Sequence, residues 1–442
     1  MFYPIRHNVH RYFDFARHNT SYRQETVAGI ATFLTMAYII VVNPAILAAA
    51  GIPRDASITA TIIAAAFGTL VMGVYAKRPF AIAPYMGENA FITFTVVKGM
   101  GFSWQTALGA IFLAGVLFTF LTVFKVRSWL AEAIPRSLKH SFAVGIGLFL
   151  TFIGLNQIGV VAPGVPGAPV TLGHVNSPAT MLALLGFLVT AVLLVRGVNG
   201  ALISGIIVTT VLSFLSGVTP LPHGVISLPP SIAPIAGHLD IAGAFTLKAL
   251  PVVVIVFVMA FVDTIGTLVA LSTRAGLLDD EGNLPEIEKP MLADALANLV
   301  APFVGTTTSG AFVESAVGIA EGGRTGFTAL VVALLFVLSL FFAPLLTAVP
   351  VHASGVALIA IGILMLSPIT QLDFHDYTEL IPAFLTIILI SFTFNVGVGM
   401  TAGLLIYPIL KLLTGRVKEV PPPLWLLSAM ALVFFIVYPY PK

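Results

Sequence analysis

The chain has 442 residues, of which 58% are hydrophobic and only 9% are charged, and its 21 Lys and Arg against 19 Asp and Glu give a net charge of +2. Soluble domains carry roughly 25% charged residues because water must solvate their surfaces, so this composition excludes a soluble globule and indicates a surface that faces lipid. The small net charge argues against a nucleic-acid partner, and the absence of Cys excludes disulfides, thiolate metal sites and Cys nucleophiles.

The N-terminal residues 1–26 are mostly polar and contain no short apolar segment before a cleavage site, so they predict a cytoplasmic tail rather than a signal peptide. Apolar stretches then predict a first set of membrane spans near 27–50, 56–76, 87–98, 104–124, 139–160, 178–195 and 200–216. After a Pro- and Gly-rich loop at 217–245, a second set follows near 248–271, 288–303, 308–320, 326–348, 353–368, 379–395 and 397–413. The C-terminal hydrophobic segment 424–442 contains a stretch, 424–438, that is either a span or an interfacial helix.

The distribution of positive charge predicts the orientation of these spans. With the N-terminus in the cytoplasm and alternate loops inside, 17 of the 21 Lys and Arg fall on the inner side. The exceptions are Arg54, Lys98, Lys248 and Lys442. Since cytoplasmic loops are enriched in Lys and Arg, we expect a multi-pass protein of the plasma (inner) membrane with a cytoplasmic N-terminus.

Two predicted spans are broken at corresponding places in the two sets. Pro79-Phe80 precedes the third span and Pro302-Phe303 precedes the tenth, and each pair is followed after six residues by a Gly, a constant offset of 223 residues. Because seven is an odd number of spans, the second set would have the opposite orientation in the membrane to the first. Interrupted spans at matching positions of inverted repeats are typical of a transporter's central site.

The interrupted stretches 79–85 and 304–309 are expected to be extended and to pair as short antiparallel strands. Unwound backbone survives at membrane depth only where protein surrounds it, because each unpaired amide or carbonyl is costly in lipid. The half-helices that follow would point their positive N-terminal ends at one spot. Such a spot suits a polar heterocycle or an anion.

Four carboxylates are predicted at membrane depth, where ionisable groups are costly and usually functional. Asp263 lies in the middle of the eighth span and Glu314 one turn after the second break, and both are interpreted as site residues rather than structural ones. Glu88, at the first break, either lines the site or caps the half-helix. Asp294 is interpreted as a structural anchor.

Neutral side chains near the breaks complete the candidate site. Asn89 can donate and accept hydrogen bonds, and Thr267 follows Asp263 by one turn. Phe91 and Phe312 are possible stacking faces, although with 33 Phe in the chain each could equally serve packing. No phosphate loop, metal-spaced His cluster or nucleophile motif is found, so the sequence predicts neither an enzyme nor a cofactor or metal.

The same residues carry a resemblance to a known family. The stretches TVAGIATFLTMAYIIVVNPAIL, DTIGTL, TRAGLLDDEGNLP and VESAVGIAEGGRTGFTALVVALLF, and more loosely MGENAF, resemble the AzgA-like purine permeases of the nucleobase–ascorbate transporter superfamily. The similarity extends from about residue 20 to 415. The segment ESAVGIAEGGRTG is the most specific part of it.

The resemblance implies an all-α membrane fold of fourteen segments in two inverted repeats of seven. A core domain would comprise residues 27–124 and 248–349, and a gate domain residues 139–216 and 353–413. Asp263 and Glu314 would accept hydrogen bonds from ring N–H or exocyclic amino groups of a purine base, beside Asn89 and Phe91. The family is typically coupled to protons, and related members form homodimers.

Three residues depart from the family pattern. Tyr85 stands where the family has Gly, Glu88 where it has Leu, and Ala260 where a second Asp precedes DTIGT. An extra carboxylate at the site could change substrate choice or coupling, so adenine, guanine and hypoxanthine are expected only as a class.

The predicted function is secondary active uptake of purine nucleobases by alternating access, driven by protons or, as an alternative, by sodium. A carboxyl in a desolvated cavity, Glu314 or Asp263, would carry the coupling proton. One alternative is a carrier of sulfate or a carboxylate with the same architecture, although acidic site residues repel anions. A second alternative is an uncoupled nucleobase facilitator.

Overall fold

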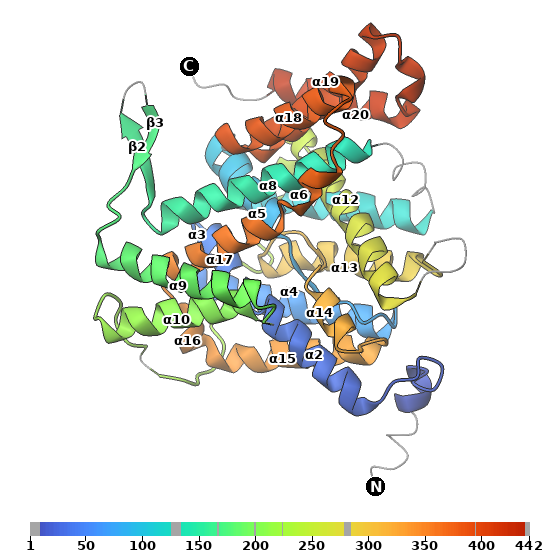
Figure 1. The fold of residues 1–442 in the computed structure, drawn as a ribbon. Helices are drawn as coiled ribbons and strands as arrows, with labels where there is room; N and C mark the ends of the chain where they lie inside the picture. Colours follow the sequence, from blue (N-terminus) through green and yellow to red (C-terminus); the bar gives the residue numbers. More distant parts are fainter. Residues whose placement is uncertain are drawn as a thin grey trace.

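The computed structural model is a mostly helical protein with two small antiparallel sheets (Figure 1), and it describes residues 9–124, 134–165, 168–198, 200–222, 224–277, 284–393 and 395–437. The elements of the first half are α2 (Tyr22–Met36), α3 (Ile39–Ala48), α4 (Arg54–Val74), β1 (Ile82–Pro84), α5 (Met86–Ala90), the π-helix η1 (Phe91–Gly99), α6 (Trp104–Val123), α8 (Arg136–Gln157), β2 (Val161–Val165), β3 (Ala168–Leu172), α9 (Pro178–Val195) and α10 (Ala201–Leu215).

The second half begins with the four-residue helix α11 (Ile241–Ala244), which interrupts the loop predicted at 217–245. The elements that follow are α12 (Leu250–Ala275), α13 (Glu288–Val304), β4 (Ser309–Ala311), α14 (Ser315–Ala320), α15 (Gly326–Ser339), η2 (Leu340–Phe342), α16 (Ala343–Thr347), α17 (Val351–Leu364), η3 (Ser367–Gln371), α18 (Tyr377–Phe392), α19 (Val396–Leu413), η4 (Val417–Glu419) and α20 (Pro422–Val437). Each predicted apolar stretch therefore contains at least one helix.

Eight helical stretches of the described chain are long and apolar enough to cross a membrane, which makes this a multi-pass membrane protein. They are Tyr22–Ala48, Arg54–Val74, Trp104–Val123, Arg136–Gln157, Pro178–Val195, Gly326–Thr347, Val351–Gln371 and Val396–Leu413. Shorter apolar helices run over Ala201–Leu215, Leu250–Phe261, Tyr377–Phe392 and Pro422–Val433.

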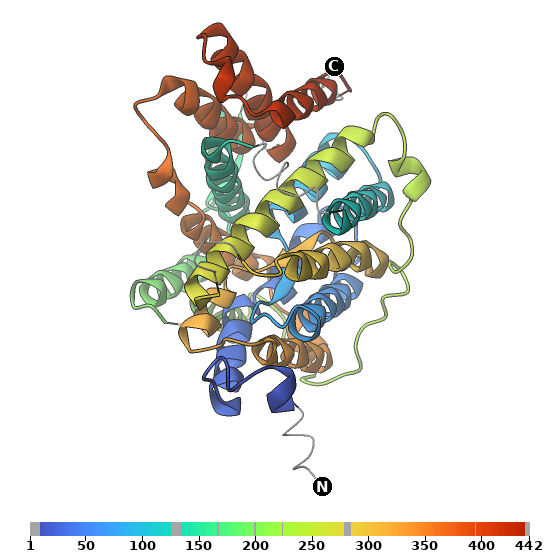
Figure 2. The ribbon, with the colours of Figure 1, turned by 90° about the vertical axis from the view of Figure 1, so that its right-hand side faces the viewer.

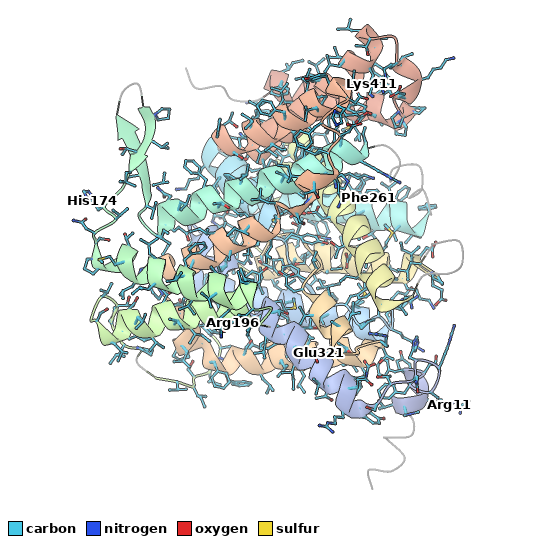
Figure 3. All side chains as sticks on the ribbon, in the orientation of Figure 1. Arg11, His174, Arg196, Phe261, Glu321 and Lys411 are labelled. Carbon is cyan, nitrogen blue, oxygen red and sulfur yellow. The ribbon has the colours of Figure 1, made fainter. Side chains whose placement is uncertain are left out.

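One residue predicted on the outer side of the membrane lies at the other end of the molecule from two residues predicted on the inner side. Figure 3 shows His174, in a loop predicted outside, on the left, and Arg11 and Lys411, both predicted inside, on the right. The helices α8 and α9 lead to the β2–β3 hairpin at the left end (Figure 1). The sidedness of the loops stays a prediction.

The helices contact one another in two groups. In one group α4 packs against α13 and α15, α2 against α15, and α6 against α12 and α13. In the other group α8 packs against α17 and α18, α18 against α19, and α9 against α10 and α17. Figures 1 and 2 show α18, α19 and α20 at one end of the molecule and α2 and α15 at the other.

The last helix, α20, contacts a member of each group. It packs against α19 and also against α12. An apolar cavity of about 20 Å³ lies where the three helices meet, with Val254, Met400 and Leu427 among its lining residues. This volume is comparable to the space that one water molecule needs.

The two interrupted stretches pair as antiparallel strands, as the sequence predicts. Ile82 lies opposite Ala311, and Pro84 opposite Ser309. The amide of Tyr85 donates to Thr308 O (3.0 Å), and the amide of Phe312 donates to Ala81 O (2.9 Å), which extends the pairing at both ends.

The predicted bounds of the second extended stretch were wrong. Residues 302–304 still belong to α13, which ends at Val304 with Gly305 in the left-handed conformation (φ 96°). Gly87 lies in helix α5, whereas Gly310 lies in strand β4. The Pro-Phe offset of 223 residues therefore does not align the two breaks. Pro302 can lie in the last turn of a helix, whereas Pro79 lies outside one.

The carboxylate of Glu25 accepts hydrogen bonds from residues at the end of the ESAVGIAEGGRTG segment and just after it. Glu25 lies on α2 and is fully buried. Its Oε1 accepts from the Arg324 amide (3.0 Å), and its Oε2 accepts from the Thr325 hydroxyl (2.9 Å) and from the amide and hydroxyl of Thr328 (3.2 and 2.6 Å). A carboxylate with this many donors at the start of α15 also complements the positive end of that helix.

Close backbone contacts require glycine in the same segment. A Cβ on Gly318 would lie 2.5 Å from the carbonyl oxygen of Ala28, and Gly322 has a φ of 98°. L side chains rarely adopt that conformation. The segment ESAVGIAEGGRTG thus forms part of the surface against which the N-terminal helix α2 packs.

Glu25→Ala is expected to lower the free energy of unfolding by about 3 kcal/mol, because several buried donors would lose their acceptor at once. The measurement is the thermal midpoint of the purified protein in detergent. Arg23→Ala, at an exposed position on the same helix, is the matched control. Equal midpoints for the two variants would contradict this role of Glu25.

Candidate functional site

The extended stretch that leads into β4 is held by polar side chains from neighbouring helices. Asn43 on α3 donates to the hydroxyls of Thr61 (2.8 Å) and Thr306 (2.9 Å). On α13, Asn298 accepts from the Ser309 amide (2.9 Å), and Asp294 accepts from the Ala311 amide (3.1 Å). Asp294 therefore makes the anchoring contact that the sequence predicts.

Strand β1 is held in the same way. The Thr69 hydroxyl of α4 bonds both the amide and the carbonyl of Ile82, at 2.9 Å each. The Ala81 amide donates to the Ser315 hydroxyl at the start of α14 (3.0 Å). These contacts satisfy backbone groups that would otherwise be unpaired within the apolar interior.

Glu88 and Asp263 lie on neighbouring helices. Glu88 is in the first turn of α5 and is fully buried. Asp263 is half-buried on α12, a helix that contacts α5. The sequence identified both as candidates but gave no reason to place their helices side by side.

Asn89 joins the two broken segments, because its side-chain oxygen accepts a hydrogen bond from the Thr307 hydroxyl. Tyr85 stacks on Phe312, with ring centroids 6.2 Å apart and planes 11° from parallel. Phe91 is fully buried in the main hydrophobic core. Of the two predicted stacking faces, Phe312 thus already has an aromatic partner.

Glu314 lies at the start of α14 and has a hydroxyl donor. The hydroxyl of Tyr38, from the break between α2 and α3, donates to Glu314 Oε1 at 2.6 Å. Thr267 is buried one turn beyond Asp263 on α12. The expected hollow between Asp263 and Glu314 stays a prediction.

Among the described residues, buried polar atoms without a hydrogen-bond partner occur in several parts of the molecule, and one group of them lies around β1, β4 and α12. This group comprises Tyr85 Oη, both carboxyl oxygens of Glu88, Asn89 Nδ2, Thr264 Oγ1, Asp294 Oδ1 and Thr308 Oγ1. Unpaired buried polar atoms are uncommon in native structures and need an explanation. Their concentration beside two half-helices is typical of a site whose polar ligand is bound only part of the time. We call this set, with Asp263 and Glu314, the crossing site.

Several residues that support the crossing site were not found by sequence reasoning. Tyr38, Asn43, Asn298 and Thr307 hold it together through the contacts above. Tyr38 and Asn43 could have been found from the sequence, because both lie in the stretch TVAGIATFLTMAYIIVVNPAIL that resembles the permeases. Nothing local in the sequence marks Asn298 or Thr307.

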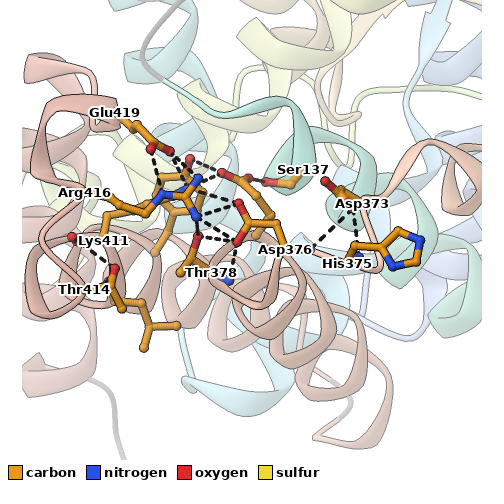
Figure 4. Close-up of polar contacts among 12 residues, drawn as sticks. Ser137, Asp373, His375, Asp376, Thr378, Lys411, Thr414, Arg416 and Glu419 are labelled. Carbon is orange, nitrogen blue, oxygen red and sulfur yellow. Dashed lines mark hydrogen bonds and ion pairs between the residues drawn. The ribbon is translucent and has the colours of Figure 1, made fainter.

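A second polar cluster lies at the end of α19 (Figure 4). Lys411 is fully buried and bonds Glu379 (2.7 Å) and Glu419 (2.8 Å), while Arg416 pairs with Asp376 (2.8 Å). The Ser137 hydroxyl of α8 donates to Glu379 Oε2 (2.5 Å), so the cluster joins α8, α18 and α19.

Asp376 and Glu419 of this cluster stay ionised over the physiological pH range. Hydrogen bonds from Thr378 and Arg416 and the charge of Lys411 lower the pKa of Asp376 from 3.8 to about 2. Hydrogen bonds from Arg416 and Lys411 lower the pKa of Glu419 to about 2. A lowered carboxyl pKa contributes stability above the unfolded value that is lost only as the pH falls toward the folded value.

The fold is that of known membrane transporters. The transmembrane domain of the cyanobacterial bicarbonate transporter BicA matches 86% of this chain and 96% of its own, with a TM-score of 0.65 and 16% identity. The murine anion transporter Slc26a9 in its inward-facing state matches 94% of this chain and 68% of its own, with a TM-score of 0.62 and 11% identity. At these identities the likeness establishes the fold alone.

Residues 23–406 match the permease family, and the chain belongs to that family of nucleobase–ascorbate transporters. The resemblance drawn from the sequence is thus confirmed. A permease of Methanocaldococcus jannaschii is 48% identical over 98% of each chain. The guanine/hypoxanthine permease PbuO of Bacillus subtilis is 42% identical over 96% of this chain and 99% of its own, and the adenine permease AdeP of Escherichia coli is 39% identical over 94% and 93%.

Lys411→Met is expected to lower the free energy of unfolding by about 2 kcal/mol, because it leaves Glu379 partly buried without a cation. Adding Glu379→Gln should recover part of the loss. Thermal unfolding in detergent measures both, with Lys418→Met at an exposed position as the control. If Lys411→Met and Lys418→Met unfold at the same temperature, the cluster does not stabilise the fold.

Proposed function

We propose that this protein takes up purine nucleobases of the adenine, guanine and hypoxanthine class by proton symport across the cell membrane. The observation that carries the proposal is the crossing site, in which hydrogen-bond acceptors outnumber donors. A purine base offers ring N–H and exocyclic amino donors to such a set. The printed names of relatives such as AdeP and PbuO support the same substrate class.

The proposed architecture has fourteen segments in two inverted repeats, with a cytoplasmic N-terminus. A core domain of residues 27–124 and 248–349 would carry the substrate past a gate domain of residues 139–216 and 353–413. The two groups of contacting helices support this division, since α4, α13 and α15 belong to one group and α8, α17 and α18 to the other. The proposed working unit is a homodimer, which the family resemblance implies.

Each site residue has a proposed role. Asp263 and Glu314 would accept hydrogen bonds from the base, and Asn89 would exchange its bond with Thr307 for one to the base. Phe312 and Phe91 would provide aromatic faces, with Tyr85 moving aside from Phe312. Thr267 and Glu88 would complete the polar lining beside Asp263.

The alternative of an anion carrier draws support from the fold likeness to BicA and Slc26a9. The charges at the site weigh against it. Glu88 lies in the first turn of α5 and Glu314 immediately before α14. Carboxylates at both half-helix starts repel the anions that helix N-termini would otherwise attract.

Purified protein in liposomes is expected to accumulate labelled adenine, guanine or hypoxanthine when the outside is made acidic. Excess unlabelled purine should compete, whereas sulfate and bicarbonate should not. A protonophore should abolish accumulation, because the gradient supplies the driving force. Sulfate uptake in place of purine uptake would refute the proposal, and purine uptake that only equilibrates would identify a facilitator.

Asp263→Asn and Glu314→Gln are each expected to reduce purine uptake by at least about 100-fold, since each amide adds a donor where the base needs an acceptor. Uptake is measured at matched protein levels in the membrane. Asp55→Asn, at an exposed position in the first turn of α4, serves as the control. Wild-type uptake in either site variant would remove that residue from the site.

A further inference from the structure

The backbone at Glu314 is fixed by the packing of a short helix against α2. Glu314 immediately precedes α14, and α14 contacts α2. One turn later Gly318 lies so close to α2 that an added Cβ would collide with the Ala28 carbonyl and the Thr32 hydroxyl. Beyond α14, the carboxylate of Glu25 on α2 holds the start of α15 through the bonds described above. The segment that carries Glu314 therefore cannot slide along α2 without breaking these contacts.

The side chain of Glu314 is fixed by a tyrosine from the same apolar span. Tyr38 lies at the break between α2 and α3, which together form the span Tyr22–Ala48. Its ring belongs to the main hydrophobic core and is only 2% exposed, and its hydroxyl donates to Glu314 Oε1 at 2.6 Å. That distance is typical of a charge-assisted bond from a hydroxyl to a carboxylate. Because closely packed side chains keep one rotamer, Tyr38 presents its hydroxyl at one place.

The bond from Tyr38 leaves one oxygen of Glu314 for a ligand. Glu314 is half-buried, and within the described part of the chain no second side chain donates to its carboxylate. A donor at Oε2 meets no competitor, whereas a donor at Oε1 would have to share that oxygen with the tyrosine. A carboxylate with two open oxygens can accept two parallel N–H groups, as it does from arginine. With Oε1 engaged, Glu314 is left with a place for one.

We propose that Tyr38 is a positioning residue that holds Glu314 ready for a single N–H of a purine base and thereby prevents the carrier from favouring guanine. The inference rests on the proposed nucleobase uptake and adds a control of selectivity to the same site. Guanine offers two adjacent donors, its ring N1–H and its 2-amino group, whereas hypoxanthine offers the ring N1–H alone. A carboxylate with a place for one donor binds the two bases similarly, because the 2-amino group finds no free acceptor there.

Removing the tyrosine hydroxyl would have two separate effects on binding. The Glu314 carboxylate would be free to rotate, and ordering it again costs affinity for every base that it binds. At the same time Oε1 would become open, so guanine recovers affinity through its second donor and hypoxanthine does not. A tyrosine that only stabilised the fold would not change the affinities for the two bases relative to each other.

The first experiment measures the half-saturation concentrations for uptake of hypoxanthine and guanine by the full chain in liposomes. The two wild-type values should agree within about threefold. In Tyr38→Phe the value for hypoxanthine should rise about tenfold and the value for guanine by less than about threefold, so the selectivity shifts toward guanine. Equal rises for both bases, or no change in either value, would overturn the proposal.

Tyr407→Phe is the matched control for this experiment. The Tyr407 hydroxyl also donates to a carboxylate, Glu379 Oε1, at 2.7 Å, but this bond belongs to the polar cluster at the end of α19. The variant should keep the wild-type ratio of the two half-saturation concentrations, and a shift toward guanine in it as well would overturn the proposal. A wild type that prefers guanine by about tenfold or more would also overturn it, even if Tyr38→Phe did not fold.

The second experiment tests the bond between Tyr38 and Glu314 without any substrate. It compares the thermal midpoints in detergent of the wild type, Tyr38→Phe, Glu314→Ala and the double variant. Since each single change removes the same hydrogen bond, the double variant should lose at least about 1 °C less than the sum of the two single losses. Additive losses would mean that the two side chains do not interact, and they would overturn the proposal.

The two experiments separate this inference from the proposed function. If the wild type takes up no purine, the proposed function fails, and the selectivity assigned to Tyr38 fails with it even where the thermal midpoints are non-additive. If the wild type takes up both bases and Tyr38→Phe keeps their ratio unchanged, the proposed function stands and the inference alone fails.

Discussion

The structure depends on one requirement, that unwound backbone in the middle of the protein must find hydrogen-bond partners. The β1–β4 pairing meets part of it, and side chains meet the rest: Thr69 and Ser315 serve β1, while Asn298 and Asp294 serve the second strand. Because these side chains come from α4, α13 and α14, the same bonds fix three helices around the strands. The position of Glu88, Asn89 and Glu314 follows from that arrangement.

The buried carboxylates fall into different chemical settings according to their donors. Glu25 has several amide and hydroxyl donors and joins α2 to α15. Glu379 pairs with Lys411 and accepts hydrogen bonds from the hydroxyls of Ser137 and Tyr407. Glu88 has no such donor among the described residues. Carboxylates with several donors contribute to the stability of the fold, whereas a buried carboxylate without donors needs another explanation, such as a bound ligand.

Sequence reasoning predicted what depends on local pattern. Hydropathy located the apolar segments, and the Pro- and Gly-rich breaks predicted the strand pair, because both signals lie within a few residues. It misplaced the second strand, since Pro302 can be accommodated inside the last turns of α13. It also missed Tyr38 as the partner of Glu314 and the contact between the helices α5 and α12 that carry Glu88 and Asp263. Those contacts join residues far apart in the chain. The hydrophobic periodicity of one segment does not indicate which other helices it will contact.

The helix α20 has a consequence for any motion between the two groups of helices. It touches α12 in one group and α19 in the other, over a small apolar cavity. Sliding of α12 past α19 must therefore shear the packing beneath α20, and the void gives the side chains there some room to change rotamer. The packing of the C-terminal helix therefore links the positions of α12 and α19.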